Sequence, residues 1–521
     1  MPLWLHIGSA GLLLLGAWLL PRHIARARAI EWPTAALDIA PIVIAALLLL
    51  VLTGRPLFAG FVLLSLAAGL ALADRAKRDA LQEPVVFSDM SELPQVFTHP
   101  QLYLPFAGPG LVIGGAAAAV AVLIGMLLFE PSLTDPAPVV FIVVAAVLCA
   151  IGWASSREPM LGAVAAMLRR RFDPAGEPFA DASRLGPFAA LYVSGVIARA
   201  ERAGRRDRYR PSAPAIVERH IEPGRPIVMV QCESFFDARR LTPQIPADLL
   251  SGFDACCATA AAFGRLDVTG WGANTMRTEF AALTGIPDCE LGYDRFNPYH
   301  AFTRVPIASL AWRLKGLGYR TLCLHPFDRR FFRRDLALPA LGFDLFFDDK
   351  KLGASRRPPY CPDPDLARHV LHALGEAGPG TFVFAITMGN HGPWHGTGAP
   401  IETGLDRELD ASVVPQGGDL LRYLDGLRQS DEMLRILIEG LERRGDGGIL
   451  VFYGDHLPSL PRAFRHFGFD EWSTDYFLWS GDASPAHRLD LPAHGLAALV
   501  LDRLRTAGGT SAIPTLPEWT A

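Results

Sequence analysis

Long apolar runs fill the first 155 residues, whereas the rest of the chain alternates short apolar runs with polar and amphipathic segments. Five of the long runs reach, or nearly reach, the length that crosses a bilayer at 1.5 Å rise per residue. Arg22 and Arg26 follow the first run and no basic segment precedes it, which argues against a cleaved signal peptide. The pattern predicts an integral membrane protein. The expected spans are Leu3–Leu20, Ala35–Leu52, Leu57–Ala73, Leu104–Phe129 and Pro138–Ala154.

Beyond residue 220, apolar runs of strand length alternate with amphipathic helices, which is typical of a mainly parallel sheet sandwiched by helices. Leucine stripes at helical spacing in 307–317 and 427–441 are expected to pack in the core. The candidate strands are Ile227–Gln231, Thr321–Leu324, Thr381–Ile386 and Ile449–Phe452.

These patterns predict an α/β protein in three parts. Residues 1–155 form a multi-span domain of about five helices, 156–220 a linker with an amphipathic helix, and 221–521 a catalytic domain. The run Leu185–Ala198 is too short to span and is expected to be an interfacial or packed helix. Pro211–Pro214 marks the boundary before the last part.

The net charge disfavours one class of partner, and the cysteine spacing disfavours two kinds of cross-link. With 49 basic and 53 acidic residues the net charge is −4, so nucleic acid is not an expected partner. The 7 cysteines show neither CxxC nor zinc-finger spacing, and their odd number excludes a fully intramolecular disulfide set.

Each candidate strand ends in a polar group. Glu233 follows the first strand, His325 the second, His391 the third, and Asp455-His456 the fourth. Open α/β sheets build their sites at the carboxyl ends of their strands. Glu233, Asp455 and His456 together offer two carboxylates and an imidazole, which suit a divalent metal. Taken singly, each is equally compatible with an ordinary turn or a solvated side chain.

A candidate nucleophile follows a glycine-rich turn. Residues 270–274 lead into a helical segment that ends at Gly285, so Thr275 would lie at a helix N-terminus, where an anion is favoured. Asn274 or Thr275 is equally well explained as a simple N-cap, and the two interpretations are compatible. A threonine hydroxyl becomes a nucleophile only when a metal or a base activates it.

Four of these segments, in this order, resemble a known family. It is the lipoteichoic acid synthase and glucan phosphoglycerol transferase group of the alkaline phosphatase and sulfatase superfamily. The resemblance covers roughly residues 226–505, and a multi-span N-terminal region is also typical of that group. The matching segments are Glu233 in QCESF, Thr275 in GANTMRTEF, His391 in TMGNHGPW and Asp455-His456 in YGDHLP.

The resemblance implies a sulfatase-like domain and a role for each residue. One divalent metal, Mn²⁺ first and Mg²⁺ or Zn²⁺ as alternatives, would be held by Glu233, Thr275, Asp455 and His456. Thr275 would be the nucleophile that takes up a glycerol-phosphate group. His391 would contact that group and assist proton transfer, and His325 and Arg334 in HPFDRRFFRRD would border the substrate, with protonated histidine and Arg334 holding phosphate oxygens.

The implied reaction moves phosphoglycerol from a phosphatidylglycerol-like lipid to a glycan or lipid acceptor through a phospho-threonine intermediate. Phe332 stands where the synthases often carry tryptophan, so glycerol recognition stays open. A phosphoethanolamine transferase and a phosphodiesterase or other hydrolase of the same superfamily are the alternatives. A non-catalytic scaffold is disfavoured because all four metal-site residues are present, and no Cys-x-Pro-x-Arg or Ser-x-Pro-x-Arg segment predicts formylglycine sulfatase chemistry.

The charge pattern and the family resemblance place the catalytic domain on opposite sides of the membrane. The basic segments Pro21–Thr34 and Asp74–Tyr103 would lie in the cytoplasm by the positive-inside rule, which with five spans puts the catalytic domain there too. The family places that domain outside the cytoplasm, where lipid donor and glycan acceptor meet. We follow the family, because Asp38 and Pro41 make one span marginal. The expectation is a multi-pass protein of the bacterial inner membrane, part of the cell envelope machinery, with a periplasmic catalytic domain.

Overall fold

The computed structural model describes residues 3–27, 30–211, 224–303, 305–353, 360–394, 418–445, 447–481 and 485–507. Its contacts group the chain into two compact units. The first comprises Met1–Gly204 with Gly292–Phe296, and the second comprises Arg205–Leu291 with Asn297–Ala521. The expected domain limits at residues 155 and 220 remain a prediction. In the expected boundary segment Pro211–Pro214, only Pro211 belongs to the described residues.

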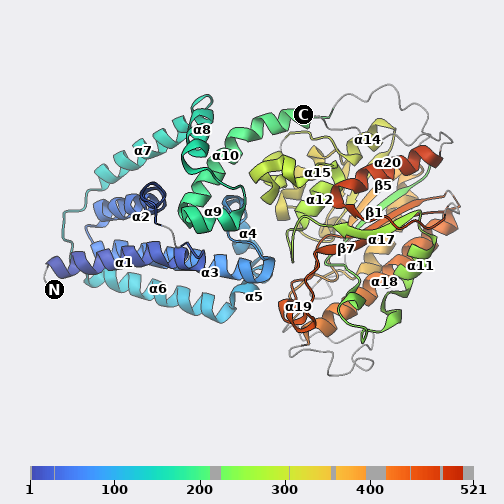
Figure 1. Cartoon of the computed structure of the whole chain (residues 1–521), viewed down its shortest axis with the longest axis horizontal. Coiled ribbons are helices and arrows are strands. Elements are labelled where there is room, and N and C mark those ends of the chain that lie inside the picture. The colour runs from blue at the N-terminus through green and yellow to red at the C-terminus, as the bar shows by residue number, and fades with distance from the viewer. Residues whose placement is uncertain are drawn as a thin grey trace. The chain divides into compact units, whose positions relative to one another are not determined.

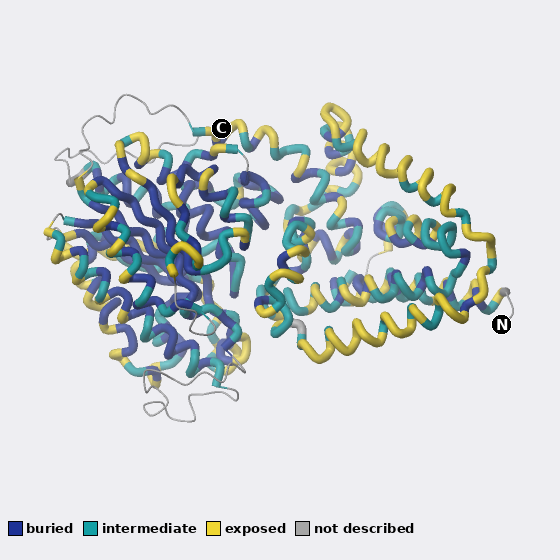
Figure 2. The backbone as a smooth tube through the Cα atoms, turned by 180° about the vertical axis from the view of Figure 1, so that it is seen from behind, coloured by how far each residue is buried: buried dark blue, intermediate teal, exposed yellow. Residues whose placement is uncertain are grey.

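The first unit contains the five expected spanning helices. Within the described residues, five helices are long and apolar enough to cross a membrane, so the chain is an integral membrane protein. In α6 and α7 no residue is buried, and both stand out as exposed in Figure 2, as lipid-facing helices do. The five are α1 (Leu3–Ile24), α2 (Trp32–Thr53), α3 (Pro56–Leu81), α6 (Pro109–Phe129) and α7 (Pro138–Ser155).

The fourth span begins later than the apolar pattern indicates. Leu104–Ala107 form a separate short helix, α5, and Gly108 with φ of 79° redirects the chain before Pro109 opens α6. The first five residues of the apolar run, 104–108, therefore lie outside the spanning helix, although their side chains are as apolar as those that follow.

A buried ion pair accounts for the aspartate inside α2. Asp38 is fully buried, and its Oδ2 accepts hydrogen bonds from Arg22 Nη1 and Trp18 Nε1, each at 2.8 Å. Its Oδ1 accepts the backbone amide of Ala189 at 3.0 Å. A charge within a span is tolerated when it is paired in this way, so Asp38 does not disqualify α2 as a membrane helix.

Further helices complete the first unit. The run Leu185–Ala198 lies at the junction of α9 and α10, and its Ala189, Val193 and Ile197 are buried, so it is a packed helix. These helices are η1 (Phe87–Ser91), α4 (Leu93–Thr98), η2 (Pro100–Leu102), α8 (Met160–Phe172), α9 (Pro178–Leu185) and α10 (Pro187–Arg208).

The second unit is built on a mixed sheet. Within the described residues eight strands pair in the order β4-β3-β5-β1-β6-β7-β2-β8. The first five in this order are parallel, whereas β7 is antiparallel to both β6 and β2. The strands are β1 (Ile227–Cys232), β2 (Ala262–Asp267), β3 (Arg320–Leu324), β4 (Leu345–Phe347), β5 (Thr381–Ile386), β6 (Ile449–Gly454), β7 (Ser473–Ser480) and β8 (Leu491–Pro492).

Helices cover both faces of this sheet (Figure 1), as the sequence predicts. Alternate residues of β1 point to two separate cores: Val228 and Val230 to one, Ile227 and Met229 to the other. The first core includes α11 (Ser251–Thr259), α17 (Asp363–Ala377) and α18 (Asp419–Arg444). The second includes α12 (Thr275–Thr284), α13 (Pro298–Phe302), α14 (Leu310–Gly316), α15 (Arg334–Ala340) and α20 (Leu496–Ala507).

Candidate metal centre and active site

The two central strands of the sheet deliver the candidate metal ligands. β1 and β6 are parallel neighbours in which Cys232 lies opposite Gly454, so Glu233 and Asp455 leave the sheet side by side. Gly454 is required for this approach, because a Cβ at that position would lie 1.8 Å from the carbonyl oxygen of Phe235.

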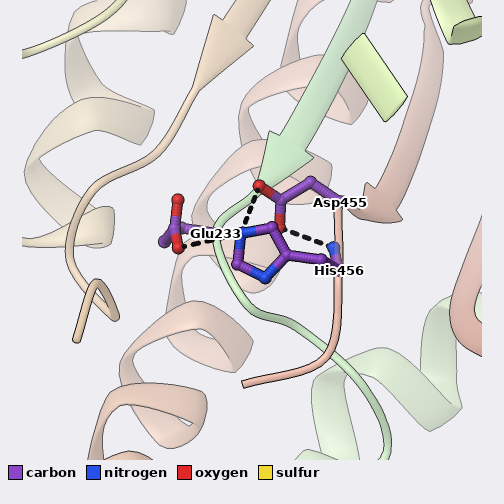
Figure 3. A group of neighbouring side chains, drawn as sticks. All are labelled: Glu233, Asp455 and His456. Atoms are coloured by element: carbon purple, nitrogen blue, oxygen red, sulfur yellow. Dashed lines mark hydrogen bonds and ion pairs between the residues drawn. The ribbon is translucent and has the colours of Figure 1, made fainter. Parts of the chain in front are cut away.

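Glu233, Asp455 and His456 form one buried cluster (Figure 3). One ligand atom from each lies within 4.8 Å of the others, and the three residues are 4%, 0% and 2% exposed. His456 Nε2 lies 3.5 Å from Glu233 Oε1 and 3.3 Å from Asp455 Oδ2.

The hydrogen bonds around this cluster leave one carboxylate oxygen without a donor and turn His456 Nε2 toward both carboxylates. His456 Nδ1 lies 2.9 Å from the carbonyl oxygen of Leu457, which can only accept, so Nδ1 carries a proton and Nε2 is the ring nitrogen that can bind a metal. Asp455 Oδ1 accepts the amides of Ser234 and His456 at 2.8 and 2.9 Å, but its Oδ2 is buried without a hydrogen-bond donor. Such an unpartnered oxygen beside a second carboxylate and an imidazole fits a cation.

The charges of the cluster also favour a bound cation. Burial, and then the neighbouring Asp455 carboxylate, raise the pKa of Glu233 to about 8. Two carboxylates therefore repel one another in a site from which water is largely excluded. A divalent cation would reverse that repulsion, and this donor set is compatible with Mn²⁺, Mg²⁺ or Zn²⁺ alike.

Thr275 adjoins the cluster at the first position of α12. The turn before it has Gly272 and Asn274 in the left-handed region, each with φ of 67°, and Gly272 forms a bridge with Pro458 in the loop that carries His456. Thr275 Oγ1 consequently lies 3.4 Å from His456 Nε2. Asn274 occupies the N-cap position, but its side chain makes no capping hydrogen bond. The structure thus brings all four residues of the expected metal site together.

Arg334 and His325 lie in a buried network with a residue that the sequence analysis missed, Glu279. Arg334 donates to Glu279 through Nη2 at 2.7 Å and Nε at 3.2 Å, and its Nη1 lies 3.2 Å from His325 Nε2. The only signal for Glu279 was its position four residues after Thr275, which puts the two on one helix face.

The protonation state of both histidines differs from the expectation. Burial, and then Arg334, hold the pKa of His325 well below its usual value. Burial also lowers the pKa of His391, whose Nδ1 lies 2.6 Å from the carbonyl oxygen of Gly392. Neither environment favours the protonated imidazole that was expected to hold phosphate. Each ring is instead favoured as a neutral hydrogen-bond acceptor at Nε2, which in His325 faces Arg334 Nη1.

Asp363 holds the loop that carries His391. Its Oδ1 accepts the amide of Gly389 at 3.1 Å, and its Oδ2 accepts the hydroxyl of Ser430 at 2.6 Å. Asp363 is 1% exposed, and this burial raises its pKa from 3.8 to about 6.

This shift predicts a pH dependence of stability. Because the folded-state pKa is raised, the native state is favoured at acidic pH, and that stability is lost as the pH rises from about 4 through about 6. Relative to Asp363→Asn, the wild-type chain should lose on the order of 2–3 kcal/mol over this window. Unfolding in a chelating buffer across pH 4 to 7.5 measures the difference. Asp365→Asn, at a half-exposed neighbour paired with Arg368, should follow the wild type, and parallel curves for wild type and Asp363→Asn would refute the shift.

Comparison with known proteins relates this chain to a family. The sulfatase family model matches residues 266–500. The capsular polysaccharide biosynthesis protein RkpI of Rhizobium meliloti is 31% identical over 445 residues, which cover 81% of this chain and 77% of that protein. A putative cyclic beta-1,2-glucan modification protein of the same organism is 30% identical over 252 residues, 47% of this chain and 38% of that protein.

A solved structure shares the fold over nearly the whole length. The integral membrane lipooligosaccharide phosphoethanolamine transferase A of Neisseria meningitidis superposes with a TM-score of 0.53 at 14% identity, covering 95% of this chain and 94% of that one.

Five apolar helices followed by a helix-covered, mostly parallel sheet with an acidic and histidine cluster define a membrane protein with a sulfatase-like domain. With 31% identity to a relative of which it covers 77%, and a sulfatase match over residues 266–500, the chain belongs to the sulfatase family of the alkaline phosphatase superfamily. This is the superfamily that its ordered segments predicted.

Proposed function

We propose that this chain is a metal-dependent transferase that moves a phosphoglycerol group from a phospholipid headgroup to a glycan acceptor through Thr275. The observation that carries the proposal is the buried cluster of ligand atoms on Glu233, Asp455 and His456, in which His456 Nε2 lies 3.4 Å from the Thr275 hydroxyl oxygen. A divalent cation held by these residues would lower the pKa of that hydroxyl and offset negative charge on the phosphate.

The chain's own residues supply the remaining chemistry. The Thr275 oxygen attacks phosphorus, the bond from phosphorus to the diacylglycerol oxygen breaks, and the hydroxyl proton ends on diacylglycerol. We assign the relay of that proton to His391 Nε2, which would hold it only transiently because burial lowers the pKa of the ring. Arg334 uses three of its five N–H donors on Glu279 and His325, which leaves two for phosphate oxygens. An acceptor hydroxyl then displaces Thr275.

Two observations favour phosphoglycerol over phosphoethanolamine as the transferred group. The ordered segments around Glu233, Thr275, His391 and Asp455 resemble the phosphoglycerol group of enzymes. All seven cysteines are free thiols, whereas phosphoethanolamine transferases usually carry several disulfides. The names of the two Rhizobium relatives concern capsular polysaccharide and a glucan, which supports a glycan as the acceptor.

Diacylglycerol release tests the donor. Purified full-length protein should release diacylglycerol from phosphatidylglycerol when Mn²⁺, Mg²⁺ or Zn²⁺ is supplied, with Mn²⁺ expected to be the most effective, and should stop when the metal is chelated. Faster release from phosphatidylethanolamine would contradict the assignment to phosphoglycerol. Release without any acceptor, at the rate seen with one, would instead favour a hydrolase.

We further infer that the protein lies in the bacterial inner membrane with its catalytic unit in the periplasm, since a lipid donor and a glycan acceptor meet there. Five spans then put the N-terminus in the cytoplasm and the basic segments 21–34 and 74–103 on the periplasmic side, against the positive-inside rule. A C-terminal alkaline phosphatase fusion should be active, and a C-terminal fluorescent protein that folds only in the cytoplasm should stay dark. The opposite pair of results would reverse the topology.

A further inference from the structure

One aromatic side chain of the second unit remains half exposed to solvent. Trp472 is 50% exposed, and among the described residues of the second unit the other exposed large apolar side chains are Leu345 and Leu489, both aliphatic. An exposed tryptophan is unusual because its ring offers the largest apolar surface of any side chain.

Strand register places Trp472 at the edge of the sheet that carries the candidate active site. Ser473 lies opposite Asp267, the last residue of β2, and Tyr476 lies opposite Tyr453, two residues before Asp455. Trp472 therefore extends just beyond the sheet, beside the loop that begins with Asp455.

A second tryptophan connects this position to Thr275. The ring centroids of Trp271 and Trp472 are 5.2 Å apart, and Trp271 is itself buried and packs edge-on against Phe464 at 5.2 Å. Trp271 precedes Thr275 by four residues, so the two Cα atoms are at most about 14 Å apart. A short oligosaccharide that rests on Trp472 can therefore extend along Trp271 toward Thr275.

The surroundings of Trp472 match the chemistry of a neutral sugar. The C–H face of a pyranose ring is apolar and weakly positive, which suits the negative face of an indole. The hydroxyl edge of the ring needs acceptors, and the adjacent Asp470 and Glu471 are both exposed carboxylates. Glu471 is paired with Arg240, which fixes its orientation. Asp470 would disfavour a sugar acid, whereas the charge of Glu471 is offset by Arg240.

We propose that Trp472, supported by Trp271, is an acceptor subsite that binds a neutral glycan and presents one of its hydroxyl groups to Thr275. This inference rests on the proposed function and names its acceptor. In the step concerned, the sugar oxygen forms a bond to phosphorus, the bond from phosphorus to Thr275 Oγ1 breaks, and the sugar hydroxyl proton is returned to Oγ1. The glycan thus leaves as a phosphodiester and Thr275 is regenerated.

Binding and transfer are measured separately to test the subsite. Full-length protein is titrated with a neutral glucotetraose by calorimetry, without lipid donor. Trp472→Ala should weaken binding at least tenfold, and Trp472→Phe, which keeps an aromatic face, should retain most of it. In the transfer assay Trp472→Ala should raise KM for the tetraose by a similar factor, while single-turnover diacylglycerol release without acceptor stays at the wild-type rate.

Leu489→Ala is the matched control, because Leu489 is 39% exposed and its amide bonds to Phe263 near the opposite end of β2. It should leave both readouts unchanged. Wild-type affinity and KM in Trp472→Ala would overturn the subsite, as would tight binding of a carboxylated tetrasaccharide or transfer to diacylglycerol in preference to the tetraose. If no lipid releases diacylglycerol, the proposed reaction fails, and the calorimetric titration still decides whether Trp472 binds glycan.

Discussion

Replacing Thr275 by alanine is expected to lower diacylglycerol release by about 10⁴-fold or more, because removal of a nucleophile eliminates the covalent route. The alanine keeps the start of α12 intact: Asn274 already supplies the turn without a side-chain cap, and Thr275 is 7% exposed. The measurement is single-turnover release of diacylglycerol from phosphatidylglycerol with metal supplied. Metal affinity, followed by calorimetry, should fall much less than the rate, because Glu233, Asp455 and His456 remain.

Thr284→Ala is the matched control for this result. Thr284 lies at the other end of α12 and its hydroxyl donates to the carbonyl oxygen of Phe280 at 2.7 Å, so the substitution removes the same group from the same helix. It should leave the rate within a few-fold of wild type. A Thr275→Ala protein that retains wild-type release would remove Thr275 from the mechanism.

Asp455→Asn should abolish most of the metal binding without destabilising the metal-free protein. Wild-type protein at one hundred times the metal dissociation constant should gain about 2.7 kcal/mol of stability, seen as a rise of several degrees in the melting temperature. Asp455→Asn should lose most of that gain and at least about 10³-fold in activity. Without metal the variant should melt no lower than wild type, because the substitution removes a charge that raises the pKa of Glu233.

Asp431→Asn serves as the control carboxylate. Asp431 is 1% exposed and accepts the first amides of α11, those of Gly252 and Phe253, so its substitution should lower the melting temperature. The rise on adding metal should nevertheless persist, because Asp431 is not among the clustered ligands. If Asp455→Asn kept the full metal-dependent rise, Asp455 would not be a ligand.

The part of the fold that the sequence predicts is the part with continuous apolar runs. β1, β5 and β6 are buried along their whole length, and they stand out in the sequence for that reason. β2 and β7 were missed: AFGRLD and STDYFLWS mix charged or polar residues with apolar ones, and they pair antiparallel next to the parallel strands. Their signal is weaker than that of a central strand, because side-chain environment in such strands depends on the partner.

The residues of the candidate site likewise differ in how well the sequence predicts them. Glu233 and Asp455-His456 were predictable, because the carboxyl ends of neighbouring parallel strands must meet at one edge. The pairing of Arg334 with Glu279 was not, because it joins α15 to α12 across 55 residues and depends on which helices pack together. The sequence did not predict the protonation states of the histidines either. The neutral form of His325 follows from its burial and from the guanidinium beside it, and neither appears in a linear pattern.

The proposed mechanism requires Thr275 to carry a glycerophosphoryl group between a lipid and an acceptor. Mass spectrometry of the peptide containing Thr275 tests it most directly, after full-length protein is incubated with metal and phosphatidylglycerol without acceptor and then quenched in acid. A glycerophosphoryl adduct is expected on Thr275, and it should disappear when acceptor is added before quenching. An ethanolamine-phosphoryl adduct formed only from phosphatidylethanolamine, or an unmodified Thr275 while diacylglycerol accumulates, would contradict it.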